Sequence, residues 1–254
     1  MRFSIIVTAI ALLLAACNNR EQEWNPKIIA HAGGGINGDI YTNSLEALTN
    51  SIAKGYKYIE FDLLFTADSV LVAAHSWEEY NTLCGQPQRG DSAPTLSEFL
   101  SQRIMGKYTP LTARQINSIF ESDSTLFLVT DKTSSPDIIE EYFPNIKEHT
   151  IVEAFSYEDY TELNRQGYHR VLYSCLAKDI SEGIIKHIIL YPLFKGEKIE
   201  WISLHTSAFD HYLFKMIDIF SYYKAALFTV NDKESVPQKH RKNIEYIYTD
   251  KITP

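Results

Sequence analysis

The sequence predicts a closed (β/α)₈ barrel, in which eight parallel strands form a cylinder and helices cover its outer face. Short runs rich in β-branched and aromatic residues alternate with segments of helical periodicity along the 254 residues. This alternation is typical of parallel sheets with helical crossovers. No internal repeat or Pro/Gly-rich linker divides the chain after its first residues, so the units fit one domain of barrel size.

The first residues have the features of an export signal. Arg2 supplies a positive start, and residues 5–14 form an apolar run that only Thr8 interrupts. This run is too short to span a bilayer as a mature helix, and small residues follow it, as in cleaved signals. We therefore expect residues 1–16 to be a signal peptide that is removed.

The end of that signal resembles the bacterial lipobox. It ends Leu14-Ala15-Ala16-Cys17, which predicts cleavage before Cys17 and diacylation of its thiol. More than one acyl chain gives stable anchoring, so residues 17–26 are interpreted as a lipidated tether to residues 27–254. The prediction is a lipid-anchored protein of the bacterial cell envelope, periplasmic or at the cell surface. An ordinary secretory signal with an incidental cysteine is the alternative.

The strands of the barrel are expected in runs of apolar, β-branched and aromatic residues. These runs are Lys27–Ala32, Tyr58–Phe65, Thr125–Asp131, Thr150–Phe155, Arg170–Cys175, Ile199–Leu204, Ala225–Asn231 and Glu245–Thr249. A ninth, Val70–Ala74, is interpreted as an excursion beside the second strand. Helical patterns lie between them, at Ser44–Lys54, Tyr157–Gln166 and Ile180–Ile189. The longest interruption, Ser76 to Ser124, predicts an inserted loop at the barrel mouth, ending in a helical stretch at Thr112–Phe120.

Composition narrows the functional class. Hydrophobic residues make up 45% of the chain and charged residues 22%, which is ordinary for a globular protein. The net charge of −8 argues against a nucleic-acid-binding surface, which needs basic clusters. An anionic substrate would then need a bound cation to invert the local field. Beyond the lipobox only Cys84 and Cys175 remain, and whether they pair is left open, as is the oligomeric state.

Acidic residues at the strand ends predict a metal site. Catalytic groups in such barrels project from the carboxyl ends of strands. Glu60 and Asp62 are two residues apart on the second strand, so both side chains point to one face. Two buried carboxylates on one face repel each other unless one is protonated or a cation lies between them. With Asp131 at the third strand end as third ligand, all-oxygen ligation suits Ca²⁺ or Mg²⁺.

Two histidines complete a set of catalytic groups. His31 follows the first strand and precedes Gly33 and Gly34, whose amides are expected to face a phosphate. His75 ends the ninth run. A phosphodiester leaving group needs a proton while the nucleophile loses one, and imidazoles of near-neutral pKa supply both functions. His205, at the end of the sixth strand, is expected to line the same mouth.

These motifs resemble those of the glycerophosphodiester phosphodiesterase family, part of a superfamily shared with phosphatidylinositol-specific phospholipase C. The matching residues are His31 and Gly33, Asn43-Ser44, Glu60-Phe61-Asp62, His75, Lys132, Phe155-Ser156, Phe228-Thr229-Val230-Asn231 and Tyr248-Thr249-Asp250. The resemblance extends from the first strand to the eighth. It implies that His31 and His75 are the acid–base pair and that Glu60 and Asp62 bind the metal.

The chain departs from the family pattern at several positions. If Lys132 matches the family lysine, the third metal glutamate of the family falls on Thr130, and Asp131 would reach the metal through a local bulge. Lys132 is then expected to contact the phosphate or to pair with a carboxylate. The family arginine is Ala32 here, and the aspartate after the second histidine is Ser76. Asn43 to Glu46 predict instead a helix start, with Asn43 as N-cap and Glu46 at the third helical position.

The sequence therefore predicts a metal-dependent hydrolase of glycerophosphodiester-like substrates, a small phosphodiester or a lipid-derived one. One alternative is phospholipase C-type cleavage, in which a substrate hydroxyl attacks phosphorus and a cyclic phosphate forms. The other is a non-catalytic barrel that binds phosphorylated ligands. Retention of both histidines and both strand-two carboxylates favours an enzyme.

Overall fold

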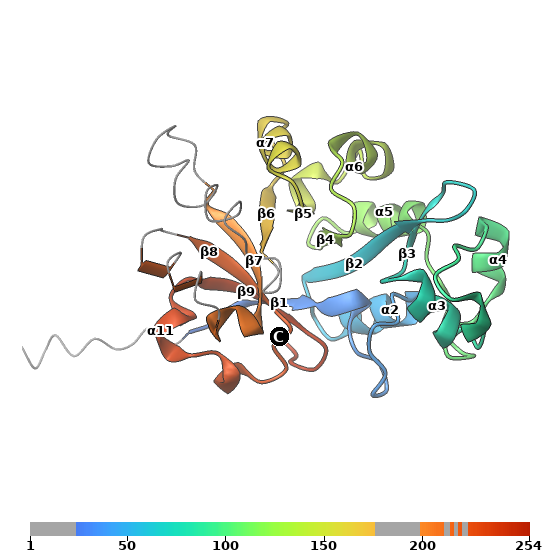
Figure 1. Cartoon of the computed structure of the whole chain (residues 1–254), viewed down its shortest axis with the longest axis horizontal. Helices are drawn as coiled ribbons and strands as arrows, with labels where there is room; N and C mark the ends of the chain where they lie inside the picture. Colours follow the sequence, from blue (N-terminus) through green and yellow to red (C-terminus); the bar gives the residue numbers. More distant parts are fainter. Residues whose placement is uncertain (1–23, 176–198, 211–213, 216–217, 220–222) are drawn as a thin grey trace, which may run out of the picture.

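The structure is a computed structural model that describes residues 24–175, 199–210, 214–215, 218–219 and 223–254 (Figure 1). The predicted signal peptide, Cys17, most of the tether and the helix expected at Ile180–Ile189 lie outside these residues. The strands of the described part are β1 (Lys27–Ala30), β2 (Tyr58–Phe65), β3 (Leu71–Ala73), β4 (Phe127–Asp131), β5 (Thr150–Ala154), β6 (Arg170–Cys175), β7 (Trp201–His205), β8 (Lys224–Phe228) and β9 (Ile244–Thr249).

All of these strands except β3 form a closed parallel barrel. Their order is β1-β9-β8-β7-β6-β5-β4-β2, and β1 pairs in turn with β2. Ile29 of β1 lies opposite Tyr58 on one side and Tyr248 on the other. The ring of strands surrounds the centre of the view in Figure 1. The predicted (β/α)₈ barrel is confirmed, and β3 pairs antiparallel with β2, as expected for the excursion.

The α-helices of the described residues are α2 (Leu45–Ala53), α3 (Trp77–Leu83), α4 (Leu96–Ser101), α5 (Ala113–Ser122), α6 (Pro136–Tyr142), α7 (Tyr157–Arg165) and α11 (Gln238–Arg241). Most of them cover the outside of this barrel, whereas α3 and α4 belong to the inserted segment after β3. Hydroxyl caps define several starts: Ser44, Ser76 and Ser156 each accept a backbone N–H from the first turn of α2, α3 and α7. In the described part of the chain, every helix is too short or too polar to cross a membrane.

Strand alternation separates two apolar layers. The barrel interior is filled by one residue or more from each of seven strands, with Tyr58 of β2 packed against them: Ile29, Val129, Ile151, Leu172, Trp201, Ala226, Tyr246 and Tyr248. The neighbouring positions, such as Ile28, Ile59, Phe61 and Leu128, pack outward under the helices. Fully burying a side chain of this size contributes about 1.5–3 kcal/mol. The interior side of each strand is therefore set by its apolar pattern.

The predicted inserted loop is a small helical unit with its own core. Trp77 and Tyr80 of α3 pack against Phe99 of α4, and Tyr108 closes the cluster. The Tyr108 hydroxyl donates to Asp39 Oδ2 at 2.7 Å and thereby ties the unit to the loop after β1. These aromatic residues are thus used for packing. Cys84, in this unit, and Cys175, at the end of β6, are both free thiols.

Candidate functional site

The polar side chains at the barrel mouth lie on the interior face of their strands. Each follows an interior apolar or aromatic residue by two positions, so the pleat points both to the same side. By this spacing Glu60 follows Tyr58, Asp131 follows Val129, and Glu153 follows Ile151. The same spacing relates Asp250 to Tyr248 just beyond β9. The apolar core of the barrel thus determines which residues face its mouth.

Glu60, Asp62 and Asp131 form a carboxylate cluster at this mouth. One oxygen from each lies within 4.8 Å of the others, and Glu60 and Asp62 are each only 1% exposed. Burial, together with the charges of Asp62 and Asp131, raises the pKa of Glu60 well above its usual range. Burial and the charge of Asp62 likewise raise the pKa of Asp131 to about 6. The cluster is a candidate site for a divalent metal ion.

An unpartnered atom shows that these residues fit a cation. Glu60 Oε1 is buried and has no hydrogen-bond partner, whereas Glu60 Oε2 accepts the Ala32 N–H at 2.7 Å. A buried carboxylate oxygen without a donor is costly. A hard cation held by carboxylate oxygens would satisfy it and offset the repulsion within the cluster.

The predicted bulge at Asp131 is not present, and its absence corrects the reasoning about Thr130. Strand β4 pairs with β2 in regular register, with Asp62 opposite Asp131 and Phe61 opposite Thr130. Asp131 therefore faces the interior by ordinary strand geometry, and Thr130 faces outward, fully buried, with its hydroxyl unpartnered. The third carboxylate is one residue away from the position that the family motif suggested.

Three non-glycine residues with left-handed backbone surround the carboxylates. Ala32, Asn43 and Lys132 have φ of 51°, 48° and 68°, and each such residue costs on the order of 1–3 kcal/mol. Each brings a donor to the cluster: the Ala32 amide to Glu60, the Asn43 side chain to Asp62, and the Lys132 amide to Asp131. The strained conformations thus serve to hold the carboxylates.

Asn43 is not the helix cap that the sequence predicted. Its Nδ2 donates to Asp62 Oδ2 at 3.0 Å, and its Oδ1 accepts the Asp62 N–H at 3.2 Å. Ser44 caps α2 instead, and Glu46 accepts the Thr109 N–H at 2.7 Å. The positive φ of Asn43 turns its side chain toward β2 rather than toward the helix start. Asn43 thus positions Asp62, a candidate metal ligand, and the sequence did not predict this because only the fold brings the two residues together.

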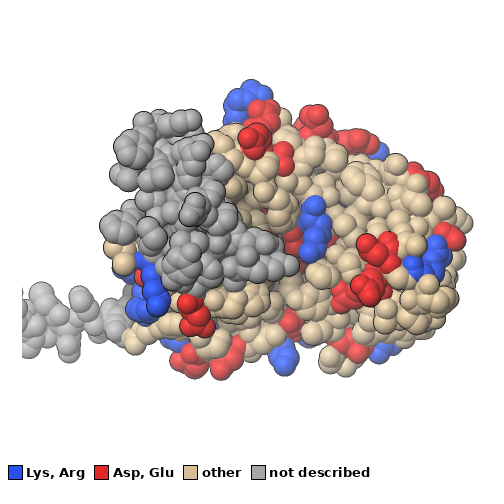
Figure 2. Space-filling view, viewed as in Figure 1, with Lys and Arg blue, Asp and Glu red and all other residues tan. Residues whose placement is uncertain are grey.

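Lys132 pairs with the carboxylates, one of its two expected roles. Its Nζ lies 3.9 Å from both Asp62 Oδ1 and Asp131 Oδ2. The side chain is 32% exposed, so the ammonium lies at the solvent side of the cluster. In Figure 2 the Lys and Arg side chains are scattered over the described part of this face rather than gathered in one patch.

His31 lies beside the cluster and is held by Asp250, which follows the last strand, β9. Its Nδ1 lies 3.1 Å from Asp250 Oδ1, and the imidazole is 12% exposed. Asn231 Nδ2 donates to the other oxygen of Asp250 at 2.9 Å. Burial raises the pKa of Asp250, but hydrogen bonds from His31 and Asn231 outweigh it and lower that pKa. The carboxylate therefore stays charged and orients the ring.

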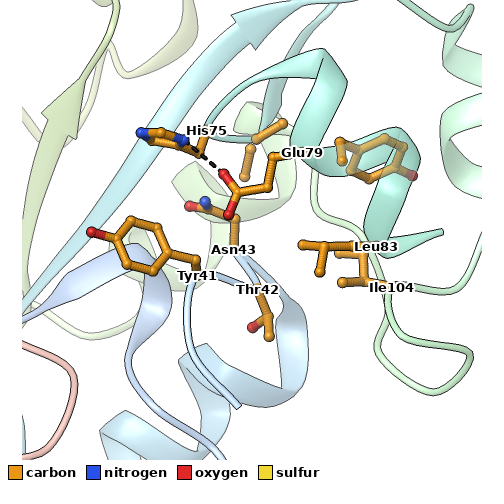
Figure 3. A pocket seen from close by; sticks show the side chains of 10 residues that line it. Tyr41, Thr42, Asn43, His75, Glu79, Leu83 and Ile104 are labelled. Carbon is orange, nitrogen blue, oxygen red and sulfur yellow. Dashed lines mark hydrogen bonds and ion pairs between the residues drawn. The ribbon is translucent and has the colours of Figure 1, made fainter. Parts of the chain in front are cut away.

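His75 has its own carboxylate partner on α3. Glu79 Oε2 lies 2.7 Å from His75 Nδ1, and Figure 3 shows Glu79 reaching from its helix to the ring. This hydrogen bond raises the pKa of His75 despite partial burial. Ser76, which stands where the family has aspartate, caps α3 instead. Glu79, four residues after His75, thus takes the position beside the histidine, and the sequence prediction did not include it.

The glycines after His31 have a packing role that corrects the expectation for Gly34. The Gly34 N–H donates to the His31 carbonyl at 2.8 Å, so this amide is not free for a phosphate. A Cβ on Gly34 would lie 2.1 Å from Ser51 Oγ, and one on Gly33 would lie 3.3 Å from Ala47. Both glycines allow α2 to approach the turn closely.

His205 and Glu153 are two further residues at the mouth and inside the barrel. His205, at the end of β7, is exposed, bonds Ser207 Oγ at 2.7 Å and has its ring 5.6 Å from Phe228. Glu153, which the sequence prediction did not include, is buried inside the barrel and accepts from Ser174 at 2.8 Å and Ser203 at 2.5 Å. Burial and the charge of Asp131 raise the pKa of Glu153 to about 8. Its interior position follows from the alternation of β5.

Comparison with known proteins relates one part of the chain to a family of enzymes. Residues 34–89 match the model of the glycerophosphoryl diester phosphodiesterase family. This stretch contains Glu60, Asp62, His75 and Glu79. None of the curated proteins compared matches the chain.

Solved structures share the fold over nearly the whole chain. A glycerophosphodiester phosphodiesterase from Thermotoga maritima is 20% identical, with a TM-score of 0.62 over 89% of this chain and 95% of that one. One from Parabacteroides distasonis is 19% identical, with a TM-score of 0.61 over 89% and 93%. An Oleispira antarctica phosphodiesterase, solved with the product sn-glycerol-3-phosphate, is 18% identical, with a TM-score of 0.59 over 89% and 93%. At these identities the likeness establishes the barrel fold.

Proposed function

We propose that this chain is a member of the glycerophosphodiester phosphodiesterase family of hydrolases and that it hydrolyses glycerophosphodiester-like substrates at the mouth of its barrel. His31 and His75 act as the acid–base pair, and Glu60, Asp62 and Asp131 hold a divalent cation, Ca²⁺ or Mg²⁺. The observation that carries this proposal is that His31 and His75, each bonded to a carboxylate, lie at the same barrel mouth as the cluster of three carboxylates. The product bound to the Oleispira antarctica relative agrees with this substrate class.

The cation would supply electrostatic stabilisation of charge that develops on the phosphoryl oxygens. Its ligands on this chain would be one oxygen from each of Glu60, Asp62 and Asp131, with Glu60 Oε1 as an available donor atom. Asn43 and the Ala32 amide hold two of these carboxylates in place. A ligand set made only of oxygens favours a hard ion over zinc.

Proton transfer falls to the two imidazoles. Asp250 and Glu79 each engage the Nδ1 of one histidine, so the Nε2 atoms remain to exchange protons with the reacting groups. One imidazole takes a proton from the attacking water, and the other gives one to the departing alcohol oxygen. On this basis His31→Ala and His75→Ala are each expected to lower turnover on the order of 10²-fold or more.

Lys132 is proposed to contact the phosphate once a cation neutralises its carboxylate partners. In the structure the ammonium lies between Asp62 and Asp131, at the solvent side of the cluster. The Gly33 amide and His205 are proposed as further substrate contacts at the mouth.

We also propose that the protein is exported and anchored to a membrane of the bacterial envelope through lipids on Cys17. The support is the sequence Leu14-Ala15-Ala16-Cys17 after an apolar run of signal length. Metabolic labelling with a radioactive fatty acid tests this proposal, with Cys17→Ser as control. Label that persists in Cys17→Ser would contradict it.

A substrate panel tests the proposed activity. Glycerophospho-alcohols and phosphatidylinositol are incubated with the protein, with and without added Ca²⁺ or Mg²⁺, and the products are followed by phosphorus NMR. Release of glycerol phosphate that depends on the metal supports hydrolysis. A cyclic phosphate would instead indicate phospholipase C-type cleavage. Binding without turnover of any substrate would indicate a non-catalytic barrel.

A further inference from the structure

Tyr41 lies between the two histidines of the site. Its ring centroid is 4.5 Å from that of His31 and 5.5 Å from that of His75, with both pairs edge to face. Among the described residues, it alone makes ring contacts with both imidazoles. In Figure 3 the Tyr41 and His75 rings extend in the same direction, away from the helix that carries Glu79. The phenol is therefore placed where a substrate of the proposed reaction must lie.

The backbone holds Tyr41 there in a strained conformation. Its φ of 59° lies in the left-handed region, which is uncommon for a bulky residue. The loop is fixed on both sides of it: the Asn43 N–H donates to the Ala32 carbonyl at 3.0 Å, and Asp39 accepts from Tyr108 at 2.7 Å. Strain that surrounding contacts maintain is found mainly at functional sites, so the placement of this ring requires an explanation.

In the described part of the site, side-chain donors for a phosphate are few beside the first histidine. Position 32, next to the first histidine, is an alanine that is fully buried and has no polar side chain. The Lys132 ammonium is shared between Asp62 and Asp131. The phenol between the imidazoles is a neutral donor at this site.

Tyr41 stays protonated over the pH range in which imidazoles titrate. Burial raises its pKa, and the charges of Asp250, Asp62 and Glu60 add to this effect, so that the pKa reaches about 12 although a hydrogen bond with Thr229 opposes the rise. A phenol O–H next to anionic phosphoryl oxygens gives a charge-assisted hydrogen bond, which is stronger than a neutral one.

We propose that Tyr41 is a further catalytic residue, whose hydroxyl donates a hydrogen bond to a non-bridging phosphoryl oxygen of the substrate between His31 and His75. This inference rests on the proposed phosphodiesterase activity. It gives the chain a phosphate contact on the loop after β1, where Ala32 provides none.

Kinetics of Tyr41→Phe test this role, because the ring and its packing are kept and only the hydroxyl is removed. Tyr168→Phe is the matched control: Tyr168 is also buried, and its hydroxyl bonds Glu140 at 3.3 Å, before β6 begins. The substrates are the glycerophospho-alcohol that wild type cleaves fastest and its two phosphorothioate diastereomers, each with one non-bridging oxygen replaced by sulfur.

Tyr41→Phe should lower kcat/KM about 10- to 100-fold, as expected for one charge-assisted hydrogen bond, with an unchanged Tm. Sulfur accepts a hydrogen bond weakly, so the diastereomer that places sulfur at Tyr41 should react slowly in wild type. That diastereomer should lose much less activity in Tyr41→Phe than the oxygen substrate does. Tyr168→Phe should match wild type for all three substrates.

Equal kinetics of Tyr41→Phe and wild type would overturn the role of Tyr41 and leave the proposed activity intact. The same holds for a loss of activity that is identical for the oxygen substrate and both diastereomers, because this outcome indicates a purely structural ring. Absence of turnover by wild type itself, with metal added, would instead overturn the proposed function on which the inference rests.

Discussion

His31 Nδ1 and Asp250 Oδ1 lie 3.1 Å apart although 219 positions separate them along the chain. The contact forms where β1 and β9, the first and last strands, pair and close the barrel. Asn231 fixes the same carboxylate through its side-chain amide. The strand pairing that closes the barrel therefore also orients His31, one of the two imidazoles of the proposed acid–base pair.

Asp250→Asn should lower kcat on the order of 10²-fold, because an amide neither holds the required tautomer of His31 nor stabilises its imidazolium. Steady-state kinetics on the preferred glycerophosphodiester measure the effect. Asp232→Asn, an exposed change whose oxygen still accepts the Glu234 N–H, is the control. An Asp250→Asn enzyme as active as this control would remove Asp250 from the site.

Glu79→Gln should lower the pKa of His75. The hydrogen bond from Glu79 raises that pKa above its usual value, so the imidazolium persists to higher pH in wild type. Removing the negative charge should move the His75 titration, followed by NMR of the ring protons, to lower pH. In the pH profile of kcat/KM, the limb that depends on this imidazolium should also move to lower pH. Glu78→Gln, exposed on the same helix turn, should change neither, and an equal shift in both variants would contradict the pairing.

Asp131→Asn should weaken binding of Ca²⁺ or Mg²⁺, whereas Thr130→Val should not. Asp131 contributes an oxygen to the cluster, and Thr130 faces outward with an unpartnered buried hydroxyl. The affinity of each variant for Ca²⁺ or Mg²⁺ is measured by the loss of terbium luminescence as that ion displaces bound terbium. The valine has the same shape and removes an unsatisfied group, so its free energy of unfolding should be unchanged or higher. Weaker binding by Thr130→Val alone would place the third ligand at position 130 after all.

Glu153→Gln should make the free energy of unfolding decrease less steeply as the pH rises. The pKa of Glu153 is about 8 in the folded protein, against about 4.3 for a free glutamate. Between these values the folded state keeps a proton that the unfolded state releases. The free energy of unfolding therefore decreases as pH rises, by at most about 1.4 kcal/mol per pH unit for this group.

Urea unfolding of chelator-treated protein at pH 5.5 and 7.5 measures this difference. The charge of Glu153 also helps to raise the pKa of Glu60, so its removal flattens the pH dependence through both groups in the same direction. Glu148→Gln, an exposed change, should retain the wild-type dependence. A Glu153→Gln protein with the same pH dependence would show that this carboxyl is already ionised at pH 5.5.

Local pattern predicted the strands closely. The run at Tyr58–Phe65 was expected with the bounds that the structure has, and so was Arg170–Cys175. The strand expected to continue to Asn231 ends at Phe228. Beyond it the Val230 N–H still donates to the Tyr248 carbonyl of β9, but the Asn231 side chain donates to Asp250 instead of continuing the strand. Such a departure depends on a neighbouring strand and has no signal in the segment itself.

Glu79 and Asn43 show why part of the candidate site could not be predicted. Asn43 precedes a helix, where its commonest use is capping, and only its positive φ and the adjacent β2 direct it to Asp62. Glu79 lies in the first turn of a helix, where acidic residues are common for the helix dipole alone. Their roles depend on which elements pack beside them.

The amino-acid sequence by itself determined the strands, their interior faces and hence the convergence of Glu60 and Asp62, because side-chain direction alternates along a strand whatever surrounds it. Tertiary structure decided the partners: Asp131 opposite Asp62, Asp250 beside His31, Glu79 beside His75 and Tyr41 between the imidazoles. Those contacts join residues on different elements, and barrel closure and loop geometry are what bring the elements together.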